Sequence, residues 1–315
     1  MCDTIVVALG GNALAPVGET VTVHDQFRHT RESLEVVVTL AEAGWRIAIV
    51  HGNGPQVGNA LRRNECAMDQ VEPLPLGVLV AGTAGWMGYM VQQSLQNALR
   101  KAGVDRQVLT VITQTLVARD DPSLHDPTKP IGMAIDESLA DALRARGDHV
   151  GKDAAGRLRR LAPSPNPVDV VEAEAVKQLV DEGKIVVAAG GGGTPVYDDP
   201  GVGFEGVDAV VDKDRTAAIL GARLGADTLL ILTDVAAVHH DWGTEHARPI
   251  RRMTVSEAHT LLRTESLGRG SMVPKLEAAI KFVELGGRRA VIAHLAEGMP
   301  ALEGETGTSI FGDSE

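Results

Sequence analysis

The chain has 315 residues, of which 44% are hydrophobic and only 3% aromatic, and its formal net charge is -12. This length favours one large α/β unit with insertions, or two lobes that share a sheet, and the negative charge argues against a general nucleic-acid binder. Two cysteines, Cys2 and Cys66, cannot build a disulfide framework, and no apolar stretch reaches the length of a membrane span, so we expect a cytoplasmic protein.

Short runs rich in β-branched residues predict strands, because each run ends in glycine or small polar residues. The predicted strands are 4–9, 46–50, 108–112, 185–189, 228–232 and 289–293. Helices are predicted at 31–43, 87–102, 168–182 and 274–285, and each is followed by a glycine that suits a helix end. The strands are apolar on both faces, which favours a mostly parallel sheet with helices on each side. In such sheets, ligands bind beyond the carboxyl ends of the strands.

The segment 120–167 breaks this alternation of strands and helices. It is rich in Pro, Gly, Asp and Arg, and its apolar periodicity is confined to about residues 135–144. Strands resume directly after the segment, so it predicts a protruding insertion or lid and not a linker between domains.

Two glycine-rich turns follow predicted strands in the first third of the chain. Gly10, Gly11 and Asn12 form the first turn, and the second is the segment 51–58, His-Gly-Asn-Gly-Pro-Gln-Val-Gly. Glycines at such places aim backbone N–H groups at an anion, although an ordinary turn explains the first pair about equally well. The second spacing is not that of a dinucleotide fingerprint, so a dehydrogenase is disfavoured. For His51 we expect a hydrogen bond to backbone, without a role as a base.

Four consecutive glycines, 190–193, follow a third predicted strand. Glycine loses more conformational entropy on folding than any other residue, so a close approach by a ligand is the preferred explanation. The chain holds no G-x-x-x-x-G-K-[ST] motif, so any phosphate site here is not a P-loop. Thr233, Asp234 and Val235 follow the strand 228–232 and suit contact with a nucleotide, although Thr-Asp is also an everyday turn pair.

Three lysines, Lys129, Lys213 and Lys275, lie in predicted loops or at predicted helix starts. Each taken alone is most simply a solvated surface residue. Together they suit phosphoryl transfer, which needs positive charge around the oxygens of the moving group and little covalent help from the protein. Asp214, next to Lys213, could orient two ammonium groups and keep them charged.

The motifs that carry these residues occur in a recognisable order. They are VVALGGNAL, HGNGPQVG, PTKPIG, PSPNPVDVVE, GGGGTPV, EGVDAVVDKD and GSMVPK. Nearly end to end, the sequence resembles the amino acid kinase family and, within it, the branch that phosphorylates carbamate. The resemblance implies one domain over 1–315, an open αβα sandwich with a mainly parallel eight-stranded central sheet and a protruding lid. It further implies an acceptor-side half (1–119 and 168–189), a lid (120–167), a nucleotide-binding half (190–315) and a homodimer.

The resemblance also implies roles for individual residues. Lys129 would reach from the lid to the acceptor or the moving phosphoryl group, Lys213 would stabilise that group, and Asp214 would orient the lysines. Carbamate or carbamoyl phosphate would be surrounded by Gly10, Gly11, Asn12, Gly52 and Asn53. ATP or ADP would contact Gly190, Gly191, Gly192, Thr233, Asp234, Val235, Met272 and Lys275. Mg2+ would be held chiefly by nucleotide oxygens, with few protein ligands, and phosphoryl transfer would be direct and in line, within arginine metabolism.

Two alternatives remain open from the sequence. The residues after Gly132 and the segment 81–86 differ from the family pattern, which keeps open a kinase for another small acid. A nucleotide-binding sensor without turnover is the other alternative, and the three retained lysines count against it.

Overall fold

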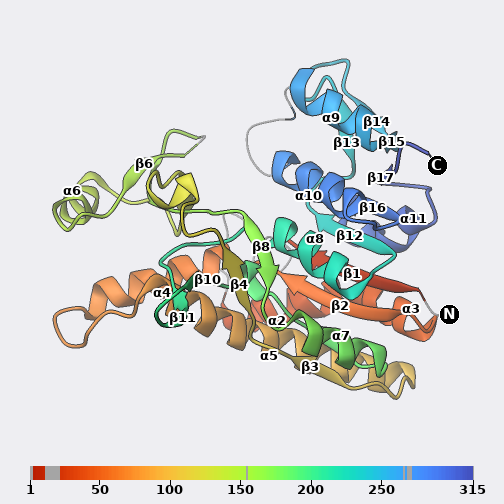
Figure 1. The fold of residues 1–315 in the computed structure, drawn as a ribbon, viewed down its shortest axis with the longest axis horizontal. Helices are drawn as coiled ribbons and strands as arrows, with labels where there is room; N and C mark the ends of the chain where they lie inside the picture. The colour runs from red at the N-terminus through yellow and green to blue at the C-terminus, as the bar shows by residue number, and fades with distance from the viewer. Residues whose placement is uncertain (1–2, 11–21, 154, 265–266, 268–271, 315) are drawn as a thin grey trace.

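The computed structural model describes residues 3–10, 22–153, 155–264, 267 and 272–314. Its centre is an eight-stranded sheet in the order β15-β17-β16-β12-β1-β2-β9-β3 (Figure 1). Neighbouring strands are parallel throughout except for β16 and β17, which are antiparallel. The strands are β1 (Thr4–Leu9), β2 (Arg46–His51), β3 (Val108–Thr110), β9 (Ile185–Val187), β12 (Thr228–Thr233), β15 (Arg252–Thr254), β16 (Arg289–His294) and β17 (Thr308–Phe311). The mainly parallel α/β fold that the sequence predicts is therefore confirmed.

Helices cover both faces of this sheet because its strands are apolar on both sides. In β1, Val6 and Ala8 pack into one core, whereas Ile5, Val7 and Leu9 pack into the other. The first core is closed by α7 (Ala173–Asp181), α8 (Lys213–Leu224), α9 (Val255–Thr264) and α10 (Met272–Glu284). The second is closed by α3 (Glu35–Glu42), α5 (Leu76–Ala102) and α11 (Gly298–Leu302). The result is an αβα sandwich.

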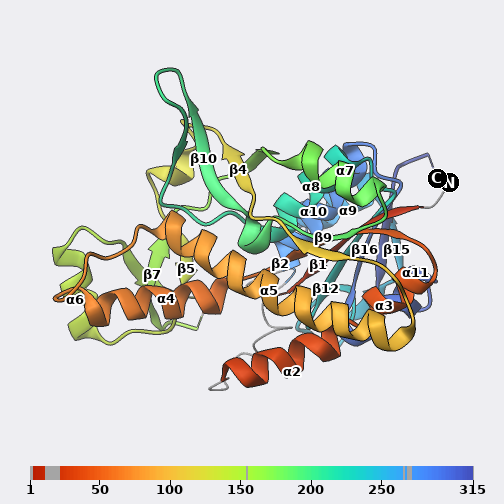
Figure 2. The ribbon, with the colours of Figure 1, turned by 90° about the horizontal axis from the view of Figure 1, so that it is seen from below.

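The segment between β4 (Gln114–Val117) and β8 (Pro167–Val170) forms a small body of its own, which Figures 1 and 2 show at the far end of the molecule from the chain termini. It contains η1 (Pro122–Leu124), α6 (Glu137–Ala145) and a three-stranded antiparallel sheet of β5 (Lys129–Ile131), β7 (Leu158–Ala162) and β6 (Val150–Lys152). We call this body the lid. It rests on α4 (Gly54–Ala67) and α5 through a third apolar cluster that includes Ile131 and Ala162 from the lid and Val57, Leu61 and Val80 from the two helices.

Two smaller sheets complete the architecture. One has the order β11-β10-β4-β8 and contains β10 (Thr194–Asp199) and β11 (Gly203–Gly206), a hairpin that projects from the body in Figure 2. The other pairs β13 (Val238–His240) with β14 (Arg248–Ile250). The remaining elements are α2 (Val23–Ser33), which packs on α5, and the short turns η2 (Gly190–Gly192) and η3 (Leu295–Glu297).

Several predicted element boundaries were wrong. The predicted helix 31–43 is two helices, α2 and α3, which are separated at Leu34. The predicted helix 168–182 begins as strand β8, which pairs with β4, and becomes helical only at Ala173. Helix α5 starts at Leu76, directly after Pro75, and so is longer than the predicted 87–102. Within the described ranges, none of the helices has the length and apolar character needed to cross a bilayer.

Candidate active site

The turns that the sequence singled out meet at the carboxyl edge of the central sheet. β12, β1, β2 and β9 are consecutive neighbours in the parallel part of the sheet, so the segments that follow them emerge side by side. The N–H of Gly10 donates to the carbonyl oxygen of Leu232 (3.1 Å), and the N–H of Gly52 donates to that of Leu9 (3.0 Å). These bonds tie the first two turns to the sheet. Gly11 and Asn12 lie outside the described residues.

Two of the predicted lysines share one buried carboxylate. Lys213 opens α8 and Lys275 lies in the first turns of α10, and these two helices pack against each other. Asp214 accepts hydrogen bonds from both ammonium groups, through Oδ1 from Lys213 and through Oδ2 from Lys275 at 3.2 Å. Asp214 is 2% exposed and Lys275 is 6% exposed. The predicted orienting role of Asp214 therefore has a physical basis in this contact.

The lid supplies the third lysine. Lys129, the first residue of β5, places its Nζ 3.3 Å from Oδ2 of Asp212. Asp212 also caps α8, because its Oδ1 accepts from the backbone N–H of Asp214 at 3.0 Å. Sequence reasoning missed Asp212 as a site residue. Its position directly before Lys213, at the start of a helix, was the only available signal, and that signal is shared by every helix cap.

The charges of this site are coupled to one another. Burial raises the pKa of Asp212, but the ammonium groups of Lys129 and Lys213, the N–H of Arg215 and the ammonium of Lys275 outweigh it and lower the pKa to about 2. Burial lowers the pKa of Lys213, and the positive charge of Lys275 adds to this effect, whereas the two aspartates oppose it. Three ammonium groups thus face two carboxylates at a helix N-terminus, which makes the site attractive to anions.

Asn53 precedes α4 and lies against Gly191 of the glycine run. Its Nδ2 donates to Oγ1 of Thr83 at 2.9 Å, and its side chain is 6% exposed. Thr83 belongs to α5 and lies in the segment 81–86, which departs from the family pattern. That segment therefore helps to hold Asn53 in place through the Thr83 hydroxyl.

The first two residues of the glycine run lie against the turn after β2. A Cβ added to Gly190 would lie 2.6 Å from Nε2 of His51, and one added to Gly191 would lie 2.1 Å from Nδ2 of Asn53. The close approach that requires glycine here is thus to the protein's own side chains. A closely approaching ligand is therefore not needed to explain glycine at these two positions.

The next two glycines are required for the same kind of reason. A Cβ on Gly192 would lie 2.4 Å from the carbonyl oxygen of Val211, and one on Gly193 would lie 2.1 Å from Oγ1 of Thr115. All three of Gly191, Gly192 and Gly193 also have positive φ. The run therefore fastens the acceptor-side turn to the segment that leads into Lys213, and a bound ligand is not needed to explain its composition.

His51 is fully buried at the end of β2, and its Nδ1 lies 3.1 Å from the carbonyl oxygen of Gly52. The predicted hydrogen bond to backbone is confirmed. Burial lowers the pKa of His51, partly offset by the carbonyl groups of Gly52 and Ala84, and Lys213 lowers it further. The imidazole is therefore neutral at pH 7.

The residues predicted for the nucleotide lie beyond β12 and at the start of α10. Thr233 is 6% exposed and its Oγ1 donates to Oδ1 of Asp234 at 3.1 Å. Met272 is buried in the same apolar cluster against which Val235 packs. Thr233 ends β12 and Val235 follows it, and β12 contacts α10, the helix that carries Met272 and Lys275. Residues 268–271 of the adjoining motif lie outside the described residues.

Several known proteins are similar to this chain over nearly its whole length. The sequence profile of the amino acid kinase family matches residues 3–294. The carbamate kinase of Pyrococcus horikoshii is 42% identical over 313 residues, covering 98% of this chain and 99% of that protein. The carbamate kinase of Halobacterium salinarum is 45% identical over 307 residues, covering 97% of each. Among solved structures, the Giardia lamblia carbamate kinase bound to AMP-PNP superposes with a TM-score of 0.92 at 33% identity, and 99% of each chain is covered.

Proposed function

We propose that this chain, which belongs to the amino acid kinase family, is a carbamate kinase that transfers a phosphoryl group between carbamoyl phosphate and ADP. One observation carries the proposal: Lys213 and Lys275 share the buried carboxylate of Asp214, and the lid brings Lys129 to the neighbouring Asp212. This constellation concentrates positive charge where a phosphoryl group would pass. The similarity of the whole chain to carbamate kinases supports carbamate as the acceptor.

The two walls of the site divide the substrates between them. Gly10, Gly52 and Asn53, together with Gly11 and Asn12, would surround carbamate. The nucleotide would lie over α8 and α10, with its phosphates near Lys275 and with Gly190, Gly191, Gly192, Thr233, Asp234, Val235 and Met272 on its side of the site. The Giardia enzyme that binds AMP-PNP has the same fold, which supports an adenine nucleotide as the second substrate.

In the direction of ATP synthesis, an oxygen of the ADP β-phosphate attacks the phosphorus of carbamoyl phosphate. The bond from phosphorus to the carbamate oxygen breaks, and the electron pair leaves with carbamate. No proton has to move in this step, so no general base is required. Lys129 and Lys213 would compensate the charge on the phosphoryl oxygens, and Lys275 would compensate that on the nucleotide, in a site where burial strengthens each interaction.

Mg2+ fits this site as an ion carried by the nucleotide. Asp212 and Asp214 are both engaged by lysines, and the described residues contain no cluster of His, Cys, Asp or Glu able to hold a metal. Nucleotide oxygens would therefore be its main ligands. When bound, the ion would neutralise phosphate charge and orient the β- and γ-phosphates.

A homodimer is part of the proposal, and an exposed stripe on α5 supports it. Val78, Gly82, Gly85 and Tyr89 follow one another at helical spacing, and Val78 and Tyr89 are 49% and 55% exposed. Ile112, 54% exposed, packs beside Gly85 and extends the stripe. Light scattering after gel filtration tests this surface: Tyr89→Asp should give a monomer where the unmodified protein gives a dimer, and a monomeric unmodified protein would contradict the proposal.

The activity itself is tested by ATP formation from ADP and carbamoyl phosphate. Lys213→Ala and Lys275→Ala should each lower kcat by about 10²-fold to 10³-fold, the usual cost of removing one group that stabilises transition-state charge. Lys177→Ala is the matched control, because Lys177 lies on α7 and pairs with Asp181 on the surface. Full activity in both site variants would overturn the lysine assignments. Preference for another small acid in a substrate panel, or ADP binding without turnover, would overturn the function.

A further inference from the structure

The lid joins the body through two neighbouring segments of chain. It leaves β4 after Val117 and returns into β8 at Pro167, and these two residues are the last pair of an antiparallel ladder. Figure 1 shows β4 and β8 side by side where the lid begins. A body that is attached by two adjacent connections can turn about them, because a few residues at the ends of such elements are enough to form a hinge.

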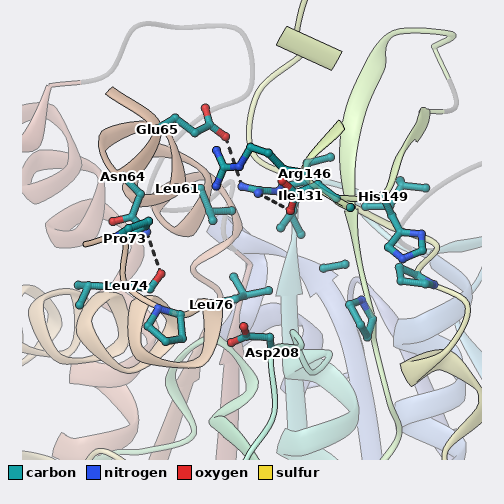
Figure 3. A pocket seen from close by; sticks show the side chains of 18 of the residues that line it. Leu61, Asn64, Glu65, Pro73, Leu74, Leu76, Ile131, Arg146, His149 and Asp208 are labelled. Carbon is teal, nitrogen blue, oxygen red and sulfur yellow. Dashed lines mark hydrogen bonds and ion pairs between the residues drawn. The ribbon is translucent and has the colours of Figure 1, made fainter. Parts of the chain in front are cut away.

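The contact between the lid and the body is interrupted by a cavity. This cavity has a volume of about 330 Å³, and its wall includes Leu61 and Leu76 from the body and Ile131 and His149 from the lid (Figure 3). Side chains on opposite sides of such a space lose the contacts that close packing would give them. The apolar cluster beside the cavity therefore leaves part of the orientation of the lid to be set by contacts elsewhere.

Hydrogen bonds join the two connections of the lid to each other. Asp121, where the chain enters the lid, accepts through Oδ2 from the backbone N–H of Asn166, where the chain leaves it, at 3.0 Å. Oδ1 of Asp121 accepts from the N–H of Ser123 at 2.9 Å and so caps η1, and β5, whose first residue is Lys129, is the next element along the chain. We call residues 121–123 and 166 the base of the lid.

Arg215 connects the base of the lid to both helices that carry the buried lysines. It follows Asp214 in α8, and its Nη1 donates to Oδ1 of Asn166 at 2.8 Å. Its Nη2 donates at 2.5 Å to Oε2 of Glu277, which lies in α10 two residues after Lys275. A guanidinium is a planar fork that donates in fixed directions, so one side chain sets the lid, α8 and α10 against one another.

The charges at this junction favour the same arrangement. Burial raises the pKa of Asp121, but hydrogen bonds from Asn166 and Ser123 and the positive charge of Arg215 outweigh it, so the pKa lies below its ordinary value. Arg215 is thus attracted by a carboxylate of the lid and by that of Glu277. A backbone bond of 3.0 Å from segment 210 to segment 163 also ties the lid to the chain before α8, so loss of Arg215 should loosen the lid without freeing it.

We propose that Arg215 is a positioning residue, which fastens the base of the lid to α8 and α10 and so places Lys129 at the lysine site before substrate binds. This role rests on the proposed function, in which Lys129 contacts the acceptor or the moving phosphoryl group. Arg215 acts through Lys129 and does not have to touch either substrate. Its side chain is 31% exposed, so its substitution should leave the core folded.

Chemical labelling of lysines tests the position of Lys129 without a measurement of kinase activity. Trinitrobenzenesulfonate is the probe, and Lys177 is the internal reference, because the two side chains are 34% and 36% exposed and each forms one ion pair with an aspartate. Labelling follows the fraction of molecules in which the ammonium is released. Peptide mass spectrometry should show that Arg215→Gln raises the labelling of Lys129 relative to Lys177 about fivefold, the upper end for one exposed ion pair.

Three further variants separate the contact at the base of the lid from a general effect on α8. Asn166→Ala removes the acceptor on the lid side and should raise the labelling of Lys129 about as much as Arg215→Gln. Arg215→Lys should give an intermediate value, because an ammonium keeps the charge but not the fork of donors. Arg223→Gln is the matched control and should change nothing, because Arg223 joins α8 to β8 through Asp169 but lies in the last turn of the helix.

A double-mutant cycle tests whether Arg215 acts through Lys129. In ATP formation, Arg215→Gln should lower kcat/KM for carbamoyl phosphate about fivefold in the unmodified background, but by less than about twofold in Lys129→Ala. Equal losses in both backgrounds would overturn the proposal. Unchanged labelling of Lys129 in Arg215→Gln and Asn166→Ala, or an equal rise in Arg223→Gln, would also overturn it. The expected labelling pattern without any ATP formation would support the fastening of the lid and would overturn the proposed function alone.

Discussion

The two sides of the lysine site are held in place by very different amounts of structure. Lys213 and Lys275 stand on packed helices above the central sheet, and their side chains are 12% and 7% exposed. Lys129 stands on a three-stranded lid sheet, and its side chain is 34% exposed. The first pair is fixed by a core, whereas the third lysine is fixed by one ion pair and a small lid contact.

This difference separates two requirements of phosphoryl transfer. A rigid core can hold charges in advance of the reaction, which is how a buried site stabilises a transition state without reorganising. Substrates must also enter and leave, which requires that part of the site can move aside. Substitutions in the core pair and in the lid should therefore fail in different ways.

Asp214→Asn should have the largest effect, because it removes the carboxylate that holds the two lysines in the core. The change leaves Lys213 and Lys275 buried side by side without their shared carboxylate, and breaking such a buried pair costs about 3 kcal/mol or more. We expect kcat to fall about 10³-fold and the free energy of unfolding in urea to fall by about that 3 kcal/mol. Asp169→Asn, which breaks the exposed pair with Arg223, should change the stability by less than about 1 kcal/mol. An Asp214→Asn enzyme with normal kcat would contradict the shared-carboxylate role.

Gly58→Ala should displace the lid without destabilising the core that holds Lys213 and Lys275. A Cβ on Gly58 of α4 would lie 2.1 Å from Cα of Gly132, the residue after β5, so the lid would have to move away. Displacement of a reacting group by about 1 Å can cost about 10²-fold in rate, and we expect that loss in kcat. Alanine is more favourable than glycine inside a helix by about 1 kcal/mol, so the melting temperature should not fall along with kcat.

Gly54→Ala is the matched control for this lid substitution. Gly54 lies on the same helix, and a Cβ there meets nothing within 4 Å among the described residues. Equal loss of kcat in both variants would show that the substitutions disturb the helix itself and not the contact between Gly58 and the lid.

Much of this arrangement could be predicted from local sequence. The strand 4–9 is apolar from Ile5 to Leu9 and buried at every position, as expected for a strand that is covered on both faces. The lysines and Asp214 were predicted as site residues because several charged residues in loops fit one kind of chemistry, and the structure brings them together with Asp212. The lid segment was predicted because its composition interrupts the alternation of predicted strands and helices.

The features that sequence reasoning missed depend on neighbours far away in the chain. Gly58 requires glycine because of Gly132, and Gly190 requires it because of His51, and neither partner is visible from local pattern. Asp212 looks like any helix cap until Lys129 is brought to it from 83 positions earlier. The helix predicted at 168–182 failed because pairing with β4 overrode local preference at its start.

Asp212→Asn should have a smaller effect and sharpens the comparison from the lid side. Asparagine caps a helix about as well as aspartate, so α8 should lose little stability, at most about 1 kcal/mol. The ion pair that holds Lys129 at 3.3 Å is lost, however, and Lys129 is no longer placed before substrate binds. We expect kcat/KM for carbamoyl phosphate to fall about tenfold, less than in Lys129→Ala. A loss of 3 kcal/mol or more in urea unfolding would instead make Asp212 a structural residue of the core.

The pH dependence gives the smallest effect and separates charge from packing in the core pair. The pKa of Lys213 is lowered from 10.5, so its ammonium is lost at a lower pH than that of an exposed lysine. The alkaline decline of kcat/KM, which reports the free enzyme, should therefore begin below pH 10.5, and in Lys213→Arg it should move to higher pH because guanidinium keeps its charge.

Stability should respond with the opposite sign. Folding lowers the pKa of this cation, so the charged form costs the folded state free energy at pH values below the folded-state pKa. The free energy of unfolding should therefore rise as the pH goes from the folded-state pKa toward 10.5. If activity and stability instead declined together over that range, alkaline unfolding and not loss of the Lys213 charge would explain the profile.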